Sequence, residues 1–299
     1  MKVLVTGSSG LIGGELVAEL RRQGHGVTRL VRRPATGAGE ASWDPSAGTI
    51  EAGKLEGHDG AVHLAGVGIS DHRWTDDHKK AVLDSRVQGT GLLARTLAQL
   101  DHPPKVLISG SAVGFYGYDS DQSKTEQDPK GHGFLADVVD AWEQAAQPAA
   151  DAGIRTVRIR SGVVITARGG ALKPQLLPFK LGIGGRLGSG DQWLSWISLE
   201  DEVAAILHLL TADATDGPVN ATSPNPVTND EFTKTLGKVL GRPTFMPVPT
   251  PALHAMFGKE MTKEMLLGGQ RVLPATLEAA GFTFAYPTLE QVLRHTLGR

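Results

Sequence analysis

The chain has 299 residues, of which 40% are hydrophobic and 21% are charged, which suits one large domain or two unequal domains of an ordinary soluble globular protein. Its formal net charge of -2 gives no electrostatic basis for binding nucleic acid or an anionic membrane. It contains no cysteine, which excludes disulfides, thiolate nucleophiles and cysteine-ligated metal sites and is consistent with a reducing cytoplasm.

The first 160 residues alternate short β-branched runs with longer helical patterns, which is typical of βαβ units around a parallel sheet. The first apolar run is too short for a signal-peptide core, and no other run is long enough to cross a bilayer, so we expect a cytoplasmic protein. The predicted strands are residues 2–6, 27–31, 60–65, 106–109 and 156–160, and the predicted helices are residues 10–23, 76–100 and 135–152.

After residue 160 the pattern changes to a glycine-rich stretch at 182–190, followed by Trp193 and Trp196. Two capping boxes, Ser198 with Asp201 and Thr228 with Glu231, predict the starts of two helices. We therefore predict an α/β protein: a Rossmann domain with a doubly wound parallel sheet over residues 1–165, to which later segments return, and a smaller mixed α/β substrate region of unknown function over residues 166–299.

A glycine-rich loop, GSSGLIG at residues 7–13, links the first strand to the first helix. Gly7 allows a tight turn, Gly10 lets the backbone approach a pyrophosphate, and Gly13 lets the helix pack closely against the sheet. The helix N-terminus then directs N–H groups and a positive dipole at the phosphates. A glycine turn without a ligand is the alternative, but the order of strand, loop and amphipathic helix favours a dinucleotide site that includes Ser9, Leu11 and Ile12.

The end of the second strand distinguishes NAD from NADP. An NAD site places an acidic residue there for the ribose 2′-hydroxyl, but here the strand ends with Arg32 and Arg33, and the next acid is Glu40. Guanidinium groups suit a 2′-phosphate because they form charge-assisted, often bidentate hydrogen bonds. Surface arginines can follow a strand by chance, yet beside the glycine loop they favour NADP(H) as cofactor.

Three segments resemble the extended short-chain dehydrogenases of the NAD(P)-dependent epimerase/dehydratase superfamily: TGSSGLIG at 6–13, DGAVHLAG at 59–66 and SGSAVGFYG at 109–117. Further segments are similar to an atypical branch described as epimerase family proteins, namely residues 73–75, 84–87, 160–164, 187–190, 195–197, 226–232 and 269–274. The resemblance covers nearly the whole chain. It implies that Arg32, Leu64, Ala65, Gly66, Arg86 and Val164 line the cofactor, although Arg86 could equally be a solvated helix charge.

The superfamily's Tyr-x-x-x-Lys pair is missing from this chain. At the corresponding helix the two positions are Phe134 and Val138, or Leu135 and Val139, depending on the register. Proton transfer typically contributes about 10²- to 10⁴-fold, so its loss slows hydride transfer without forbidding it. The remaining candidates are the Ser111 hydroxyl, which could hydrogen-bond a carbonyl, and the Tyr116 hydroxyl as a substitute donor.

Both hydroxyls have an equally good structural interpretation, with Ser111 at the end of a buried strand and Tyr116 packed in the following turn. No histidine lies in a metal-binding motif, so no metal site is expected. Two functions follow. The chain is an NADP(H)-dependent oxidoreductase or epimerase-like enzyme acting on a small carbonyl or sugar-like molecule, or a catalytically weak NADP(H)-binding protein that acts through protein partners. The sequence leaves the substrate and the oligomeric state open.

Overall fold

The computed structural model describes residues 1–299, except for the side chain of Ser120. Its strands are β1 (Lys2–Thr6), β2 (Gly26–Val31), β3 (Glu40–Asp44), β4 (Thr49–Ile50), β5 (Gly60–His63), β6 (Val106–Ala112), β7 (Asp119–Lys124), β8 (Arg155–Ser161), β9 (Val163–Ile165), β10 (Trp193–Leu194), β11 (Trp196–Ser198), β12 (Gly217–Ala221), β13 (Val227–Thr228) and β14 (Gly269–Val272).

Eleven α-helices and three short helical turns accompany these strands in the described part of the chain. The α-helices are α1 (Leu11–Arg22), α2 (Asp76–Ala98), α3 (Phe134–Ala145), α4 (Gln147–Asp151), α5 (Lys173–Lys180), α6 (Leu199–Thr211), α7 (Asn229–Leu240), α8 (Thr250–Phe257), α9 (Lys259–Met261), α10 (Ala275–Ala279) and α11 (Leu289–Leu297). The turns are η1 (Ala52–Leu55), η2 (Val113–Tyr116) and the π-helical η3 (Thr262–Leu266).

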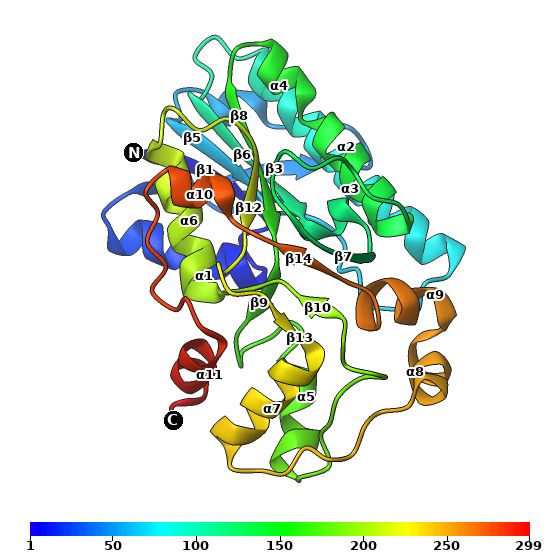
Figure 1. The fold of residues 1–299 in the computed structure, drawn as a ribbon. Coiled ribbons are helices and arrows are strands. Elements are labelled where there is room, and N and C mark those ends of the chain that lie inside the picture. Colours follow the sequence, from blue (N-terminus) through cyan, green and yellow to red (C-terminus); the bar gives the residue numbers. More distant parts are fainter. The chain divides into compact units, whose positions relative to one another are not determined.

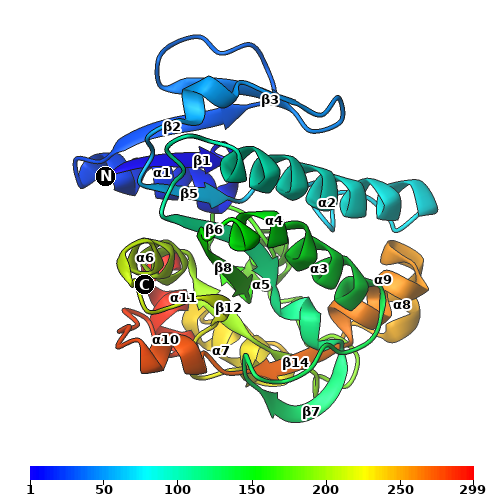
Figure 2. The same ribbon diagram turned by 90° about the horizontal axis from the view of Figure 1, so that it is seen from above.

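An eight-stranded sheet in the order β12-β8-β6-β5-β1-β2-β3-β4 forms the centre of the Rossmann fold (Figure 1). β1 pairs in parallel with both β2 and β5, so the strand order reverses at β1 and the sheet is doubly wound. Helices α1 and α6 flank one face, and α2 and α4 flank the other (Figures 1 and 2). The predicted α/β fold class is confirmed.

Some predicted elements differ from the structure in a physically simple way. The helix predicted over residues 135–152 is wrong as a single element, because α3 ends at Ala145 and α4 begins at Gln147. Pro148 lies in the first turn of α4, where its missing N–H is tolerated, whereas in the interior of a longer helix it would remove a hydrogen bond. Strands β3 and β4, the last two at one end of the sheet, were not predicted from the sequence.

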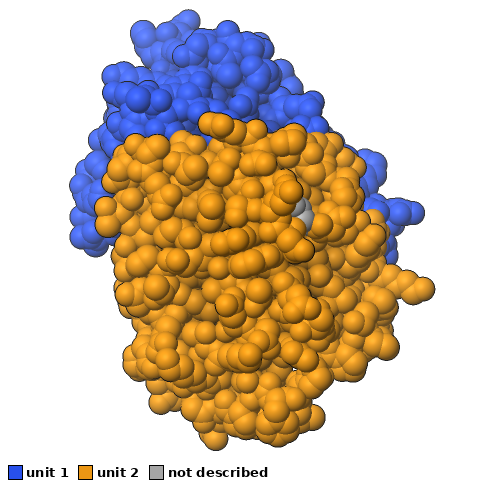
Figure 3. Space-filling view, viewed as in Figure 1, with its two compact units in different colours: residues 1–111, 138–159, 206–219 blue, residues 112–137, 160–205, 220–299 orange. Residues whose placement is uncertain are grey.

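The chain divides into two compact units that interleave along the sequence (Figure 3). Unit 1 comprises residues 1–111, 138–159 and 206–219, and unit 2 comprises residues 112–137, 160–205 and 220–299. Each unit has its own apolar core. Unit 1 buries Leu4, Leu30, Trp43, Leu93 and Leu107, and unit 2 buries Phe179, Trp196, Phe232, Leu236 and Leu293. The division into 1–165 and 166–299 remains a prediction about domains.

Both predicted capping residues begin helices in unit 2. Thr228 accepts a hydrogen bond from the Glu231 backbone N–H (3.2 Å), and the Glu231 carboxylate accepts one from Thr228 N–H (2.7 Å). Ser198 accepts from the Asp201 N–H in the same way (2.9 Å), but the Asp201 carboxylate instead accepts the N–H groups of Ala285 and Tyr286. The capping box of Thr228 and Glu231 is therefore complete. Asp201, in the first turn of α6, instead holds the segment before α11.

Replacing Thr228 with alanine should lower the free energy of unfolding by about 1 kcal/mol, because the α7 N-terminus loses its side-chain acceptor. Urea unfolding of the variant and the parent protein measures this difference. Thr211→Ala is the matched control, since Thr211 is exposed at the end of α6 and should change stability by less than about 0.5 kcal/mol. Equal losses from both substitutions would contradict a capping role for Thr228.

None of the described helices combines the length and the apolar composition that crossing a bilayer requires.

Candidate functional site

A cavity of about 770 Å³ lies within unit 1, at the carboxyl ends of β1, β2, β3 and β5. Cavities of this size are typical of cofactor sites, and this edge of a doubly wound sheet is where such folds bind nucleotides. The predicted residues that line it are Gly7, Ser9, Gly10, Arg32, Arg33, Leu64, Ala65 and Gly66. The further lining residues are Ser8, Arg29, Leu30, Val31, Trp43, Asp44, Pro45, Ser46, Val67, Asp84, Ser85 and Gln88.

The glycine loop has the close packing that its sequence predicts. Gly7 has a φ of +64°, and a Cβ there would lie 2.6 Å from the backbone of Leu64. A Cβ on Gly13 would lie 2.3 Å from the Gly7 carbonyl oxygen, so Gly13 allows α1 to approach the loop rather than lining the cavity itself. The α1 N-cap, Gly10, has no capping side chain, and the first turn has no acid. The helix N-terminus can therefore receive an anion.

A buried hydroxyl aligns the loops that follow β1 and β5. Thr6 Oγ1 accepts the backbone N–H groups of Leu64 (3.1 Å) and Ala65 (3.2 Å) and lies 2.8 Å from His63 Nδ1. Burial lowers the pKa of His63 to about 4, so the imidazole is neutral at physiological pH. Because Thr6 Oγ1 already accepts twice, its own proton is donated to His63 Nδ1. This arrangement fixes the Leu64–Ala65 backbone that faces the cavity.

Arg32 and Arg33 have different environments at the end of β2. The Arg33 guanidinium makes two hydrogen bonds to the Glu40 carboxylate, both 2.7 Å long, and Arg29 contacts the same carboxylate at 2.5 Å. Glu40 also accepts hydrogen bonds from the backbone N–H and the hydroxyl of Thr36. All these hydrogen bonds hold the pKa of Glu40 far below its usual range, and those from Arg33 contribute most. Arg32 is exposed and makes no direct ion pair with any described residue, but it lies near Asp44, whose pKa is lowered mainly by a hydrogen bond from Ser46 and also by the charge of Arg32.

Glu40 therefore orders the loop after β2 and holds Arg33, while Arg32 makes no hydrogen bond to this carboxylate. The sequence suggested two equivalent arginines, and the signal that separates them is the acid seven positions after Arg33. That acid begins β3, which pairs in parallel with β2, and the register places Arg29 directly opposite Glu40.

Arg86, on α2, is largely buried and donates hydrogen bonds to the carbonyl oxygens of Val67 (2.9 Å) and Val82 (3.1 Å). Its guanidinium lies 4.9 Å from the centre of the Trp142 ring and about van der Waals distance (3.6 Å) from where a Cβ on Gly66 would be. Burial lowers its pKa to about 10, which leaves it charged, and it has no carboxylate partner among the described residues. Arg86 is therefore not a solvent-exposed charge on the surface of a helix.

The remaining predicted cofactor residues lie outside the lining of this cavity in the described structure. Leu11 and Ile12 are in the first turn of α1, half-buried. Val164 belongs to β9 in unit 2, where it pairs with Ile197 of β11. Their contact with a cofactor remains a prediction.

Ser111 is the penultimate residue of β6 and belongs to unit 1, and its hydroxyl donates a 2.6 Å hydrogen bond to Glu143 Oε1 of α3. Both residues are buried, at 5% and 8% exposure. Because the Ser111 hydroxyl donates its proton to this carboxylate, its oxygen can only accept further hydrogen bonds. It can therefore bind a hydroxyl group that donates a proton, but not a carbonyl oxygen that needs one. Sequence reasoning missed Glu143, which lies 32 positions away.

Tyr116 is also buried and fully engaged, within unit 2. Its hydroxyl donates to Asn220 Oδ1 (2.7 Å) and accepts from the Arg160 guanidinium (2.9 Å). Burial, as the main cause, raises the pKa of Tyr116 above its usual value. The hydroxyl therefore stays protonated and is a poor base, although the charge and hydrogen bond of Arg160 partly offset the effect of burial on its pKa. Its role as a proton donor remains a prediction.

The helix that should carry Tyr-x-x-x-Lys has no room for the lysine. Val138 and Val139 of α3 are 3% and 4% exposed, within the apolar interior. At the start of the helix, the backbone N–H groups of Phe134 and Leu135 donate to the carboxylate of Glu264 (3.1 and 3.0 Å). An acid thus caps α3 where the superfamily places its catalytic tyrosine.

No group of three or more histidine and acidic residues among the described residues is arranged to hold a metal ion.

Comparisons with known proteins match most of the chain. The model of the NAD-dependent epimerase/dehydratase family matches residues 3–221, and a model for a domain of unknown function matches residues 248–296. An epimerase family protein of Mycobacterium tuberculosis is 43% identical over 297 residues, which cover 99% of this chain and 98% of that protein. The human epimerase family protein SDR39U1 is 38% identical and covers 98% of this chain and 99% of its own length.

A crystal structure of the human epimerase family protein SDR39U1 with NADPH has a similar fold, with a TM-score of 0.92. The two chains are 36% identical in that comparison, which covers 100% of each. The predicted similarity to epimerase family proteins, with the Rossmann nucleotide-binding fold, is confirmed.

Proposed function

Since the chain belongs to the NAD-dependent epimerase/dehydratase family, we propose that its unit 1 cavity binds NADP(H) and that it acts as an NADP(H)-dependent oxidoreductase or epimerase-like protein on a small carbonyl or sugar-like molecule. The observation that carries the choice of NADP(H) is Arg32. This arginine lines the cavity at the end of β2 and makes no direct ion pair with a described residue, while Asp44 in the same lining acts on its charge at longer range. The NADPH bound to the human relative supports the same choice.

The cofactor's pyrophosphate would meet the Gly7–Gly10 turn and the uncapped N-terminus of α1. Arg32 would grip the 2′-phosphate, while Arg33, held by Glu40, would shape the loop beside it. A buried cation without a counterion is costly, so an anion near Arg86 would also relieve its unpaired charge. These residues fit an anionic dinucleotide.

When bound, NADP(H) would supply or accept a hydride. The chain's own part is then to position the reacting molecule and to move a proton. Ser111 would accept a hydrogen bond from a hydroxyl of that molecule, because its own proton already lies on Glu143. Tyr116 would have to leave Asn220 and Arg160 before it could donate. We therefore expect slow proton transfer.

The engaged hydroxyls of Ser111 and Tyr116 favour a second candidate function: a catalytically weak protein that uses NADP(H) as a structural or sensing ligand and acts through protein partners. A panel of carbonyl compounds separates the two functions. NADPH consumption that Ser111→Ala reduces would support the enzyme. Tight cofactor binding without consumption would support the second candidate.

Calorimetric titration of the purified protein with NADPH and, separately, with NADH tests the cofactor assignment. We expect NADPH to bind at least tenfold more tightly, since charge-assisted hydrogen bonds contribute about 1.5–3 kcal/mol. Equal affinities would contradict the assignment of Arg32 to the 2′-phosphate. Failure of both dinucleotides to bind would contradict the proposed function.

A further inference from the structure

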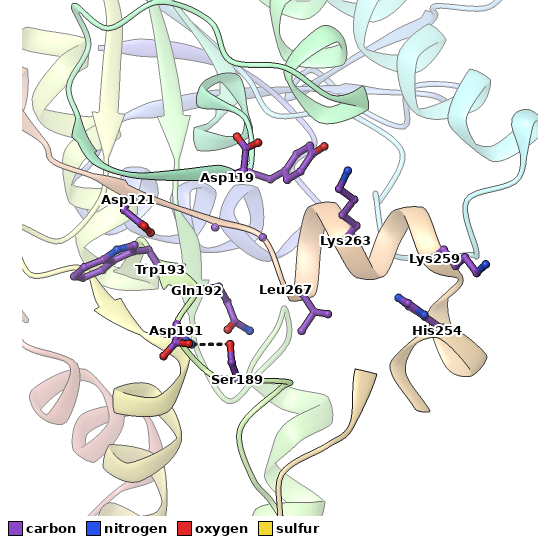
Figure 4. Close-up of a pocket in the computed structure, with 13 residues that line it drawn as sticks. Asp119, Asp121, Ser189, Asp191, Gln192, Trp193, His254, Lys259, Lys263 and Leu267 are labelled. Atoms are coloured by element: carbon purple, nitrogen blue, oxygen red, sulfur yellow. Dashed lines mark hydrogen bonds between the residues drawn. The ribbon is translucent and has the colours of Figure 1, made fainter. Parts of the chain in front are cut away.

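Unit 2 contains a second cavity, of about 560 Å³, formed by four segments of the chain (Figure 4). They are the start of β7, the loop before β10 with Trp193, the α8–η3 region, and the Gly268–Gly269 backbone before and within β14. The charged residues of its lining are Asp119, Asp121, Asp191, His254, Lys259 and Lys263. None of these residues belongs to the cofactor cavity of unit 1.

Basic side chains occupy one side of this cavity. Figure 4 shows Lys259, Lys263 and His254 on the side formed by α8, α9 and η3. None of the three makes an ion pair with a described residue. Lys263 lies over the Tyr118 ring, with Nζ 5.0 Å from the ring centre, and a hydrogen bond to Tyr118 raises its pKa. This lysine is therefore charged at neutral pH; Asp119 and Glu264 also act on its charge, but neither forms a direct ion pair with it.

Acidic side chains occupy the opposite side. Asp121 and Asp191 lie beside Trp193 in Figure 4, away from Lys259 and His254. Neither makes an ion pair with a described residue. Asp119 differs, since it pairs with His132 at 3.0 Å. The cavity thus keeps unpaired charges of both signs on opposite sides, instead of joining them in ion pairs across it.

The backbone beneath Lys263 is unusual. Residues Thr262–Leu266 form a π-helical turn, and its neighbour Leu267 lines the cavity with Lys263. π-Helical turns are rare and occur frequently at functional sites. This turn places the lysine over Tyr118 instead of leaving it on a regular helix surface.

We propose that this cavity binds a small dipolar molecule that carries an ammonium group and a phosphate or carboxylate group. The anionic group would lie against Lys259 and Lys263, and the ammonium group against Asp121 and Asp191. A ligand with one charge would leave one side of the cavity without a counterion. The inference deepens the proposed function in one respect, because it names the class of molecule that the protein would act on.

Binding can be tested without cofactor, on the full chain, by calorimetry at low ionic strength. Glucosamine 6-phosphate carries both charges, whereas glucose 6-phosphate and glucosamine carry one each. We expect the first to bind at least tenfold more tightly than either of the others. Lys263→Met should weaken both phosphorylated probes, and Asp191→Asn should weaken both amino probes. Lys180→Met removes an exposed lysine outside the cavity and should change nothing.

The proposal would be overturned if the three probes bound with equal affinity or if none of them bound. It would also be overturned if both cavity variants kept the affinities of the parent protein. Because NADPH is absent, these outcomes do not depend on the cofactor assignment, and a failed NADPH titration would leave them standing. Adding NADPH to the bound complex then tests the link to the proposed function. Consumption of NADPH identifies the ligand as a substrate, and its absence removes that link while binding remains.

Discussion

Replacing Arg32 with alanine should lower the affinity for NADPH by about 10- to 150-fold and leave the affinity for NADH unchanged. The range corresponds to the 1.5–3 kcal/mol or so that hydrogen bonds to a charged group contribute. Arg32 lines the cofactor cavity and makes no direct ion pair with a described residue, so its donors are available to a 2′-phosphate. Calorimetric titration of the variant with both dinucleotides measures the effect.

Arg33→Ala is the informative control for this prediction. Its guanidinium already makes two hydrogen bonds to Glu40, so its removal should cost less NADPH affinity than removal of Arg32. Equal losses from the two variants would show that both arginines bind the phosphate. A loss of NADH affinity in Arg32→Ala would show that this arginine holds a part common to both dinucleotides.

The free energy of unfolding of the Glu202→Gln variant, relative to that of the parent protein, should rise by about 3 kcal/mol between pH 4.5 and pH 8. Glu202 is fully buried in α6, and burial raises its pKa to about 7 from an ordinary 4.5. Ser161 donates a hydrogen bond to Oε1, but Oε2 has no partner among the described residues. Burial therefore favours the protonated, neutral form of this carboxyl group.

The sign follows from linkage. Below pH 4.5 the folded and unfolded states both carry the proton, so the parent keeps its full stability. Between pH 4.5 and about 7 the unfolded state has given up this proton while the folded state keeps it, so the parent loses about 1.4 kcal/mol per pKa unit of difference, and the loss levels off above pH 7. Glutamine does not titrate and escapes this loss. The buried His63 titrates in both proteins, so its contribution cancels in the comparison.

Urea unfolding of both proteins at a series of pH values gives this difference directly. Glu278→Gln, at an exposed position on α10, should show no comparable dependence on pH. If Glu202→Gln and the parent had parallel stability profiles from pH 4.5 to 8, Glu202 would be ionised with an ordinary pKa in the folded protein.

Local patterns in the sequence were sufficient to predict the part of the unit 1 cavity that the glycine loop forms. Strand, glycine loop and helix follow one another within residues 2–22, and the close contacts of Gly7 and Gly13 are those that the motif implies. The capping residue Thr228 was found in the same way, from a pattern four residues long. Each of these features depends on residues that are neighbours in the chain.

The features that were missed depend on partners distant in the chain. The Ser111–Glu143 hydrogen bond spans 32 positions, and the Tyr116–Asn220 bond spans 104. Neither periodicity nor spacing shows which polar group a buried hydroxyl will meet. Trp43 and Ser46 line the unit 1 cavity because β3 pairs with β2, and a short strand after a glycine-rich loop has too little pattern to be recognised.

The interleaved units have a consequence for how the protein is made. Unit 1 needs residues 206–219, which include most of β12, the strand at one end of its eight-stranded sheet. During synthesis, the nascent chain therefore exposes an incomplete sheet edge at β8 until residue 219 has left the ribosome. Unpaired strand edges in such intermediates are prone to aggregation. Unit 1 thus cannot complete its sheet until residues 206–219 are available, long after its first 111 residues have been made.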